Sequence, residues 1–398
     1  MNTVEGTMNK MYSGINPAEM AEGIIQLIQK EYKELERLNI MILGKTGVGK
    51  STLVNNMFNE RLAETGIGKP ITQSIRRIEK PNIPLSIYDT PGLELGGENA
   101  LDNLLDEIVE IIDKGIKSGV SNAIHCIWYC ISTPSHRFEQ AEIDFLQKFL
   151  DKTSKYNVPV IIVLTQSYSK KSADELKLEI EKENLAVSSV VSVLAEDFEI
   201  DDEYIAKAYG LAQLSEITYN VMPEQIQKTF VSVQKANLAL KKSKAQAVVA
   251  ASAAAALATG AVPIPFSDAA LLVPEQITML VGITSVFGIP IEKATIAAVV
   301  SSTIGSAGAT VLGKTIVTNL LKLIPGVGTV VGGVISGATA AALTTALGET
   351  YISVLTNICK GEFKISELST KEGQKQISNM FKERLMIKRN DKGEAIEG

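Results

Sequence analysis

Apolar and amphipathic stretches alternate along residues 38–220. The apolar runs have the length of buried strands and fall at 38–43, 74–80, 83–89, 123–131, 159–165 and 188–194. Between them, apolar residues recur at helical spacing over 50–59, 100–117, 137–152, 171–183 and 205–220. This alternation predicts an α/β fold, a mixed, mostly parallel six-stranded sheet with helices on both faces. The short link Pro81-Asn82 predicts one antiparallel hairpin at the sheet edge.

The rest of the chain is patterned as helix. Residues 17–37 carry apolar side chains along one side and Glu, Gln and Lys along the other. Residues 245–348 contain only six charged residues, whereas 21% of the whole chain is charged, and this shift marks a domain boundary. We therefore expect an N-terminal helical segment over 1–37, the α/β domain over 38–220, an Ala/Gly-rich all-α domain over 221–388 and a disordered tail over 389–398.

A phosphate-binding pattern follows the first predicted strand. Gly44-Lys45-Thr46-Gly47-Val48-Gly49-Lys50-Ser51 fits the P-loop spacing G-x-x-x-x-G-K-[ST], and its end runs into the predicted helix 50–59, which includes Thr52. Glycines let successive backbone N–H groups point at one phosphate, and the helix N-terminus adds partial positive charge. We expect Lys50 to reach the β- and γ-phosphates and the Ser51 hydroxyl to hold Mg²⁺. The alternative is a glycine-rich turn with a surface lysine.

Two further sequence features suit a nucleoside triphosphate. Asp89-Thr90-Pro91-Gly92 ends a predicted strand, where Asp89 can hold Mg²⁺ and Gly92 can give its N–H to the γ-phosphate. Thr72 lies in the polar loop between the two motifs, where it can complete the Mg²⁺ shell when the γ-phosphate is present. We expect Lys50 and Thr72 to be catalytic, and Ser51, Thr72 and Asp89 to be the metal ligands; for Thr72 an ordinary strand-edge threonine is the alternative.

With these motifs and this order of elements, residues 38–220 resemble the translation-factor-type GTPases, within them the Era, septin and immunity-related (dynamin-like) branch. The resemblance implies a P-loop NTPase G domain that hydrolyses GTP to GDP and phosphate with Mg²⁺. In that family an N/T-K-x-D motif reads guanine after the fifth strand. Here Thr165 matches, but Gln166 replaces Lys and Tyr168 replaces Asp, so guanine selectivity rests on another acceptor or is weak. Ser192 and Val193 resemble the loop whose backbone contacts the base.

The catalytic side also departs from the pattern of Ras-like enzymes. There, a glutamine directly after D-x-x-G orients the attacking water, but Leu93 occupies that place here. Glu94, Glu98 and His136 are alternative sources of a water-positioning group, although each also fits a solvated loop residue. We therefore expect slow hydrolysis that accelerates on self-association or with a partner. The resemblance to septins and dynamin-like proteins implies a dimer through the nucleotide face.

Composition narrows the remaining function classes. The net charge of −6 leaves no basic excess for binding nucleic acid. The cysteines Cys126, Cys130 and Cys359 have no metal or disulfide spacing, and with two histidines a zinc site is not expected. Cys126 and Cys130 share one apolar run at strand spacing, which predicts core residues. The polar N-terminus has no signal-peptide core, so we expect a cytoplasmic location with the ability to associate with membranes.

Two interpretations compete for the apolar region at 245–348. It fits a helical bundle rich in small residues. It also fits helical hairpins that enter a bilayer, because Ala294–Gly313 and Leu323–Gly348 are uncharged and reach the length needed to span one. Ala, Gly, Ser and Thr contribute little to insertion, so we favour a helical domain that is soluble when shielded and can bind a membrane surface.

A second resemblance supports membrane association. Ile264-Pro265-Phe266-Ser267-Asp268-Ala269-Ala270, with Glu275-Gln276 downstream, resembles an uncharacterised bacterial helical domain that is often fused to GTPases and described as membrane-associated. Immunity-related GTPases build such a domain from N- and C-terminal segments, a role that 17–37 would fit. The predicted function is a GTPase whose nucleotide state is coupled to this domain. The alternatives are a multi-pass membrane protein with a regulatory G domain and a nucleotide-binding scaffold with negligible turnover.

Overall fold

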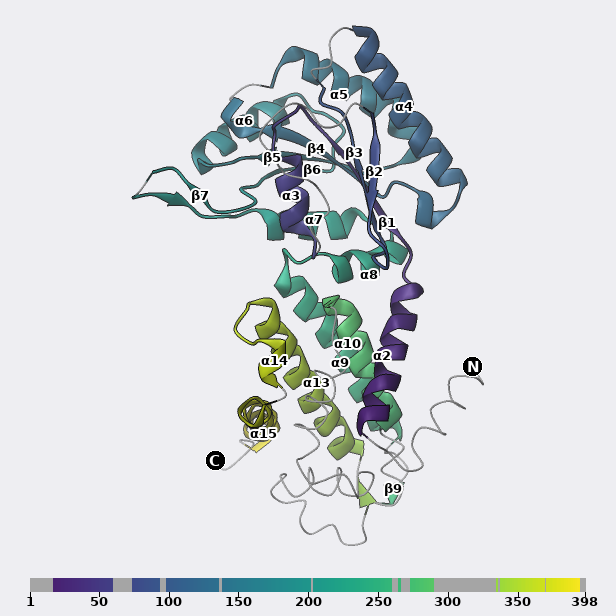
Figure 1. The fold of residues 1–398 in the computed structure, drawn as a ribbon, viewed down its shortest axis with the longest axis vertical. Coiled ribbons are helices and arrows are strands. Elements are labelled where there is room, and N and C mark those ends of the chain that lie inside the picture. The colour runs from purple at the N-terminus through teal and green to yellow at the C-terminus, as the bar shows by residue number, and fades with distance from the viewer. Residues whose placement is uncertain are drawn as a thin grey trace, which may run out of the picture. The chain divides into compact units, whose positions relative to one another are not determined.

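The computed structural model describes residues 17–59, 74–93, 98–135, 138–201, 203–259, 264–265, 273–289, 334–335, 337–368 and 370–393 (Figure 1). The chain forms two compact units, one over Lys33–Leu240 and one that joins Met1–Tyr32 to Lys241–Gly398. The boundaries that we expect at residues 220 and 388 stay predictions about which segments fold independently.

The unit Lys33–Leu240 is built on a six-stranded sheet in the order β2-β3-β1-β4-β5-β6. Its strands are β1 Leu38–Leu43, β2 Arg76–Glu79, β3 Leu85–Asp89, β4 Cys126–Ser132, β5 Val160–Thr165 and β6 Ser189–Ser192. Only the edge pair β2–β3 is antiparallel, and the other neighbours are parallel. The predicted α/β fold and the edge hairpin are therefore confirmed.

Helices cover both faces of this sheet (Figure 1). They are α3 Lys50–Met57, α4 Glu98–Lys117, α5 Gln140–Thr153, α6 Lys170–Lys182, α7 Leu211–Val221 and α8 Glu224–Val233. Apolar residues of α3, α7 and α8 pack with Ile40, Ile42 and Trp128, whereas α4, α5 and α6 pack with Met41 and Tyr129. Successive strand residues thus face opposite layers, which explains why the strands read as continuous apolar runs.

The two strand cysteines belong to the core, as their spacing predicts. Cys126 and Cys130 are fully buried in the layer that contains Trp128. Burial raises the pKa of each thiol to about 12, so both remain protonated at neutral pH. They are inert packing residues rather than ligands or nucleophiles.

The helix expected over 205–220 begins later than its pattern indicates. A short hairpin pairs β7 Phe198–Glu199 with β8 Ile205–Ala206; β8 occupies the start of that segment, and α7 begins at Leu211. Gly210, the N-cap of α7, has φ 85°, and a Cβ there would lie 2.0 Å from the carbonyl oxygen of Ser192. The close approach at Gly210 sets the helix start, and apolar spacing does not reveal it.

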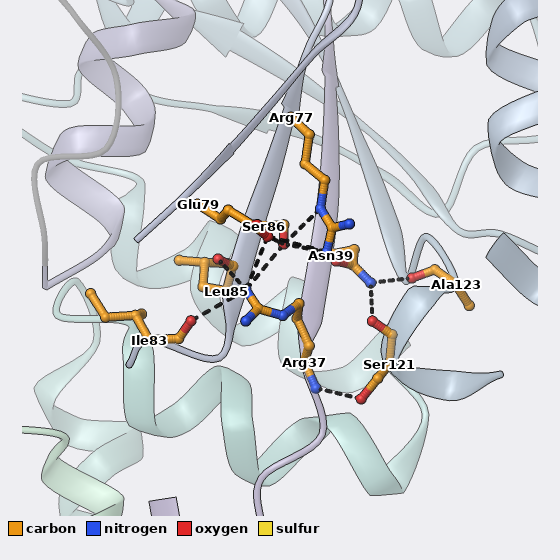
Figure 2. Close-up of polar contacts among 9 residues, drawn as sticks. All are labelled: Arg37, Asn39, Arg77, Glu79, Ile83, Leu85, Ser86, Ser121 and Ala123. Atoms are coloured by element: carbon orange, nitrogen blue, oxygen red, sulfur yellow. Dashed lines mark hydrogen bonds and ion pairs between the residues drawn. The ribbon is translucent and has the colours of Figure 1, made fainter. Parts of the chain in front are cut away.

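Polar side chains tie the amino-terminal end of the sheet together (Figure 2). The Arg37 guanidinium donates to the carbonyl oxygen of Leu85 at 3.3 Å, and its backbone N–H donates to the Ser121 hydroxyl at 3.0 Å. The Asn39 side-chain amide donates to the carbonyl oxygens of Ser121 and Ala123 at 3.0 and 2.8 Å. These bonds fix β1 between β3 and the turn before β4, so the carboxyl ends of the strands are held in register at the opposite edge.

The second unit is helical in its described part. Its longer elements are α2 Pro17–Lys33, α9 Leu238–Thr259, α10 Val273–Phe287, α13 Gly337–Cys359, α14 Ile365–Leu368 and α15 Lys371–Gly393, with a small pair of strands, β9 Ile264–Pro265 and β10 Val334–Ile335. Helix α13 contacts α10 and α15. A Cβ on Gly348 would lie 2.4 Å from Val249 and 3.0 Å from the Met279 sulfur, so the small residue allows close helix packing. The expected helical character of the C-terminal region is confirmed, although the strand pair β9–β10 means that the unit is not strictly all-α.

Among the described residues, no helix is both long enough and apolar enough to cross a bilayer. All of Ala294–Gly313 lies outside the described residues, as do 323–333 and 336 of the second apolar stretch and the last residues of the predicted tail.

One lysine of this unit is buried. Lys241, at the start of α9, is 1% exposed and donates to the carbonyl oxygens of Val286 and Phe287, at 3.0 and 2.7 Å. These carbonyls end α10, where the helix dipole favours a cation. Desolvation acts against the charge and lowers the pKa of Lys241 to about 7.

Candidate nucleotide site

The loop Gly44–Lys50 joins the carboxyl end of β1 to the start of α3, as the P-loop pattern predicts. Gly44, Gly47 and Gly49 have φ of 138°, 77° and 90°, a region that residues with a Cβ rarely adopt. A Cβ on Gly44 would also lie 2.4 Å from the carbonyl oxygen of Cys130 in β4. The sequence therefore needs glycine at these positions to hold the loop as a tight curl against the sheet.

The Lys50 side chain turns back over this curl. Its ammonium donates to the carbonyl oxygens of Gly44 and Lys45 at 2.7 and 2.9 Å. Ser51 and Thr52 lie in the first turn of α3, half-buried. The arrangement places a cation, a hydroxyl and the amino-terminal end of a helix at one point, a combination suited to an anion such as phosphate.

Asp89 lies at the carboxyl end of β3, where it pairs in register with Ile42 of β1. The Thr90 hydroxyl donates to the carbonyl oxygen of Ile42 at 3.0 Å and holds the turn that follows. Because β1 leads directly into the loop at Gly44, Asp89 and Ser51 come from segments that meet at one sheet edge. Carboxylate and hydroxyl oxygens suit Mg²⁺, which is commonly held by one or two protein groups together with phosphates.

Leu93 is buried beside the turn that contains Gly92. It is 7% exposed and packs with the apolar layer of α4 and α5. This apolar environment agrees with a residue that does not orient water. Thr72, Glu94 and His136, and the side chain of Glu98, lie outside the described residues, so their expected roles stay predictions.

The carboxyl end of β5 is fastened to the phosphate loop. The Thr165 hydroxyl lies 2.5 Å from the carbonyl oxygen of Val48 and 3.0 Å from that of Ile131. The Gln166 amide nitrogen donates to the carbonyl oxygen of Gly47 at 3.0 Å, and its amide oxygen accepts from Ser132 at 2.7 Å. Both residues of the degenerate base motif therefore support the loop.

The loop after β6 is fixed by backbone bonds. The N–H of Val193 donates to the carbonyl oxygen of Leu164 at 2.7 Å, and that of Leu194 donates to the carbonyl oxygen of Tyr209 at 3.1 Å. Ser192 is half-buried at the end of β6 and lies against Gly210. This loop therefore carries the root of the β7–β8 hairpin.

An ion-pair cluster beside the loop was not predicted. The Lys45 ammonium lies 2.8 Å from a Glu139 carboxylate oxygen and 3.1 Å from a Glu142 oxygen. Burial opposes the charge of Lys45, but the two carboxylates outweigh it and raise its pKa. Glu142 is buried in the first turn of α5. Spacing along the chain gives no sign of this contact; the only local signal is an acid in the first turn of a helix.

Two family models match the chain. Residues 39–166 match the family described as 50S ribosome-binding GTPase, and residues 225–386 match a Domain of unknown function (DUF697). The chain carries a P-loop GTPase domain fused to a DUF697 domain. The predicted fusion is thereby confirmed, and we call the unit Lys33–Leu240 the G domain.

Curated relatives match the G domain region in part. Septin-1 of Drosophila melanogaster is 29% identical over 184 residues, which are 40% of this chain and 49% of that protein. Translocase of chloroplast 108, chloroplastic, of Physcomitrium patens is 43% identical over 56 residues, 14% of this chain and 6% of that protein. The chain thus spans half or less of the length of these relatives.

Two solved structures are similar to part of the chain. A probable GTP-binding protein engB has 18% identity and a TM-score of 0.31, with 46% of this chain and 97% of that chain covered. Era of Aquifex aeolicus has 23% identity and a TM-score of 0.33, with 48% of this chain and 58% of that chain covered.

Proposed function

We propose that this protein binds GTP in the P-loop and hydrolyses it to GDP and phosphate. The observation that carries the proposal is the curl Gly44–Lys50, in which three positive-φ glycines, the Lys50 ammonium and the start of α3 converge. On binding, the Lys50 ammonium exchanges the carbonyls of Gly44 and Lys45 for β- and γ-phosphate oxygens.

The remaining site residues take roles by position. Backbone N–H groups from Gly44 to Thr52 cradle the phosphates, and the N–H of Gly92 binds the γ-phosphate. Ser51 and Asp89 would hold Mg²⁺, with Thr72 as a third ligand. Mg²⁺ supplies charge neutralisation at the β- and γ-phosphates when bound. Thr165 and Gln166 keep the loop against β5, and Ser192 and Val193 shape the base side.

The expected turnover is slow, because Leu93 places an apolar, buried side chain where Ras-like enzymes have a glutamine. A second protein molecule across the nucleotide face would supply the missing water-positioning group. The rate per molecule should then rise with protein concentration, whereas a constant rate would argue against a catalytic dimer. If single-turnover experiments give no phosphate, the scaffold alternative is the correct function.

Lys50→Ala tests the assignment directly. We expect this variant to lose GTP binding in calorimetry and phosphate release in a turnover assay, because it removes the cation that meets the β- and γ-phosphates. Lys114→Ala is the matched control, since Lys114 is an exposed lysine of α4 whose contact is the ion pair to Glu110. Normal turnover by Lys50→Ala would end the proposal.

We further propose that nucleotide state is coupled to the DUF697 domain and that this domain binds membrane surfaces from the cytoplasmic side. The small-residue composition of 245–348 and the sparse charge there support a surface-binding domain over a permanent anchor. Co-flotation of the full chain with anionic liposomes, compared between GTP and GDP, tests the coupling. Equal flotation in both states would contradict it.

A further inference from the structure

Recognition of guanine depends on the hydrogen-bonding groups that the base side of the nucleotide site presents. Guanine presents N–H donors at N1 and N2 and an acceptor at O6, so a site that reads guanine needs a facing acceptor and a facing donor. The described residues that could supply them lie in the loops after β5 and β6, at Gln166–Tyr168 and Val193–Leu194.

The Gln166 side chain, the Ser167 hydroxyl and two backbone N–H groups of these loops are already used within the protein. The Gln166 amide oxygen accepts from Ser132, and its nitrogen donates to Gly47. The Ser167 hydroxyl is fully buried and donates to the carbonyl oxygen of Leu164 at 2.8 Å. The N–H groups of Val193 and Leu194 both donate to backbone carbonyls. Reading guanine with these groups would require breaking bonds that hold the loops in place.

Aromatic side chains occupy the position at which recognition of guanine would need a hydrogen-bond acceptor. The ring of Tyr168 lies 4.2 Å from the ring of Phe198, centroid to centroid, at an interplanar angle of 40°. Tyr168 is half-buried, whereas Phe198 in β7 is 43% exposed. The β-bridge between Leu194 and Tyr209 joins the two ends of the hairpin segment at the loop after β6. Phe198 therefore lies beside Tyr168, on the side of the site where we expect the base.

We propose that the purine base is held by stacking on the Tyr168–Phe198 pair and not by reading of its hydrogen-bonding edge, so that the site takes GTP and ATP with similar affinity. The inference rests on the proposed nucleotide function. Aromatic stacking tolerates any base, since every base has a π-face. A site that recognises hydrogen-bonding groups rejects analogues that lack them by about 10,000-fold or more. A site that binds the base only by stacking cannot discriminate between purines in this way.

Competition binding to the full chain with GTP, ATP, inosine triphosphate and inorganic tripolyphosphate tests the proposal. We expect the three purine nucleotides to bind within about tenfold of one another, because they share the stacking surface and the phosphates. GTP binding more than about a hundredfold tighter than ATP would overturn the inference but leave the proposed function intact. Failure of all four ligands to bind would instead refute the proposed function.

Substitutions in the β7–β8 hairpin test whether the base contacts Phe198. Phe198→Ala should weaken GTP and ATP by the same factor, about tenfold, and leave tripolyphosphate unchanged. Ile200→Ala is the matched control, because Ile200 is an exposed apolar residue of the same hairpin, 50% exposed, outside the ring pair. Purine affinities that are unchanged in Phe198→Ala, or tripolyphosphate weakened equally, would overturn the proposal. Fluorescence of the buried Trp128 checks that each variant is folded.

Two substitutions test the hydrogen-bonding alternative. Tyr168→Asp supplies the missing acceptor and should raise the preference for GTP over ATP at least tenfold, and an unchanged ratio would contradict the placement of Tyr168 at the base. Glu196, an exposed carboxylate that accepts from Asn56 at 3.5 Å, is the nearby alternative acceptor. Glu196→Gln should leave the ratio of affinities unchanged, and a fall in guanine preference would overturn the stacking account.

Discussion

Lys45→Met removes the cation that neutralises a buried carboxylate. The Glu142 side chain is 9% exposed, and the Lys45 side chain is 32% exposed. Loss of one partner of a fully buried pair costs about 3–5 kcal/mol, because the remaining charge is left uncompensated. Water reaches Lys45, so this figure must be discounted for screening, and we expect the free energy of unfolding of the G domain to fall by about 1–3 kcal/mol.

Urea unfolding followed by tryptophan fluorescence measures this loss. Trp128 is the one tryptophan of the sequence and is fully buried in β4, so its signal reports the G domain and not the DUF697 domain. Glu142→Gln in the Lys45→Met background removes the stranded charge, and the double variant should lose less than the sum of the two single losses. Lys148→Met is the control, because Lys148 is exposed and lies 3.8 Å from Asp102, and it should cost less than about 0.5 kcal/mol.

Two results would refute this reasoning. A Lys45→Met variant within about 0.5 kcal/mol of the unmodified protein would show that water solvates the Glu142 carboxylate when its partner is gone. Additive losses in the double variant would show that the two side chains are not energetically coupled.

Three further predictions concern glycine geometry and buried titratable groups. Gly44→Ala should lower the free energy of unfolding of the G domain by more than about 2 kcal/mol, because the new Cβ clashes with Cys130. Gly47→Ala should lower it by about 1 kcal/mol, from the positive φ alone. Equal losses of the two variants in urea unfolding would contradict the predicted clash. Burial lowers the pKa of His125, whose Nδ1 accepts from the backbone N–H of Asn39, so the unfolded chain binds more protons and G-domain stability should fall as pH drops below about 6.5. His125→Gln should flatten that part of the urea-stability profile, and an unchanged profile would count against it. Burial lowers the pKa of Lys241 to about 7, so the unfolded chain binds more protons and stability should rise between about pH 7 and 10. Hydrogen exchange in α10, corrected for intrinsic rates, should therefore slow over this pH range, and Lys241→Met should remove the trend. A trend that persists in the variant would show that another group causes it.

The parts of the fold that follow local rules are predictable from sequence. β1 reads as a strand because both of its faces are buried, and the loop Gly44–Ser51 is recognisable because its geometry depends on residues close together in the chain. The antiparallel edge pair follows from its short link. The alternation of apolar runs and helical stretches then limits the topology to a mostly parallel sheet.

Other features depend on contacts between distant residues. The ion pair between Lys45 and Glu142 joins segments that meet only when β4 lies beside β1. Strand β8 falls within the segment 205–220 that the apolar spacing predicts as helix, because that spacing does not show the tight approach of Gly210 to Ser192. The N–H groups of Val193 and Leu194 are likewise occupied by residues distant in the sequence, Leu164 in β5 and Tyr209 before α7.

The β7–β8 hairpin has little to hold it as an independent element. Its strands share only two residue pairs, and Ile200, Tyr204 and Ile205 leave about half of each side chain in solvent. Segments with so few buried contacts open locally without unfolding the rest of the domain. Its amides should therefore exchange with deuterium early, and limited proteolysis should cut there first. An enzyme that places part of its base-binding surface on such an element would lose affinity for nucleotide well before it loses its fold.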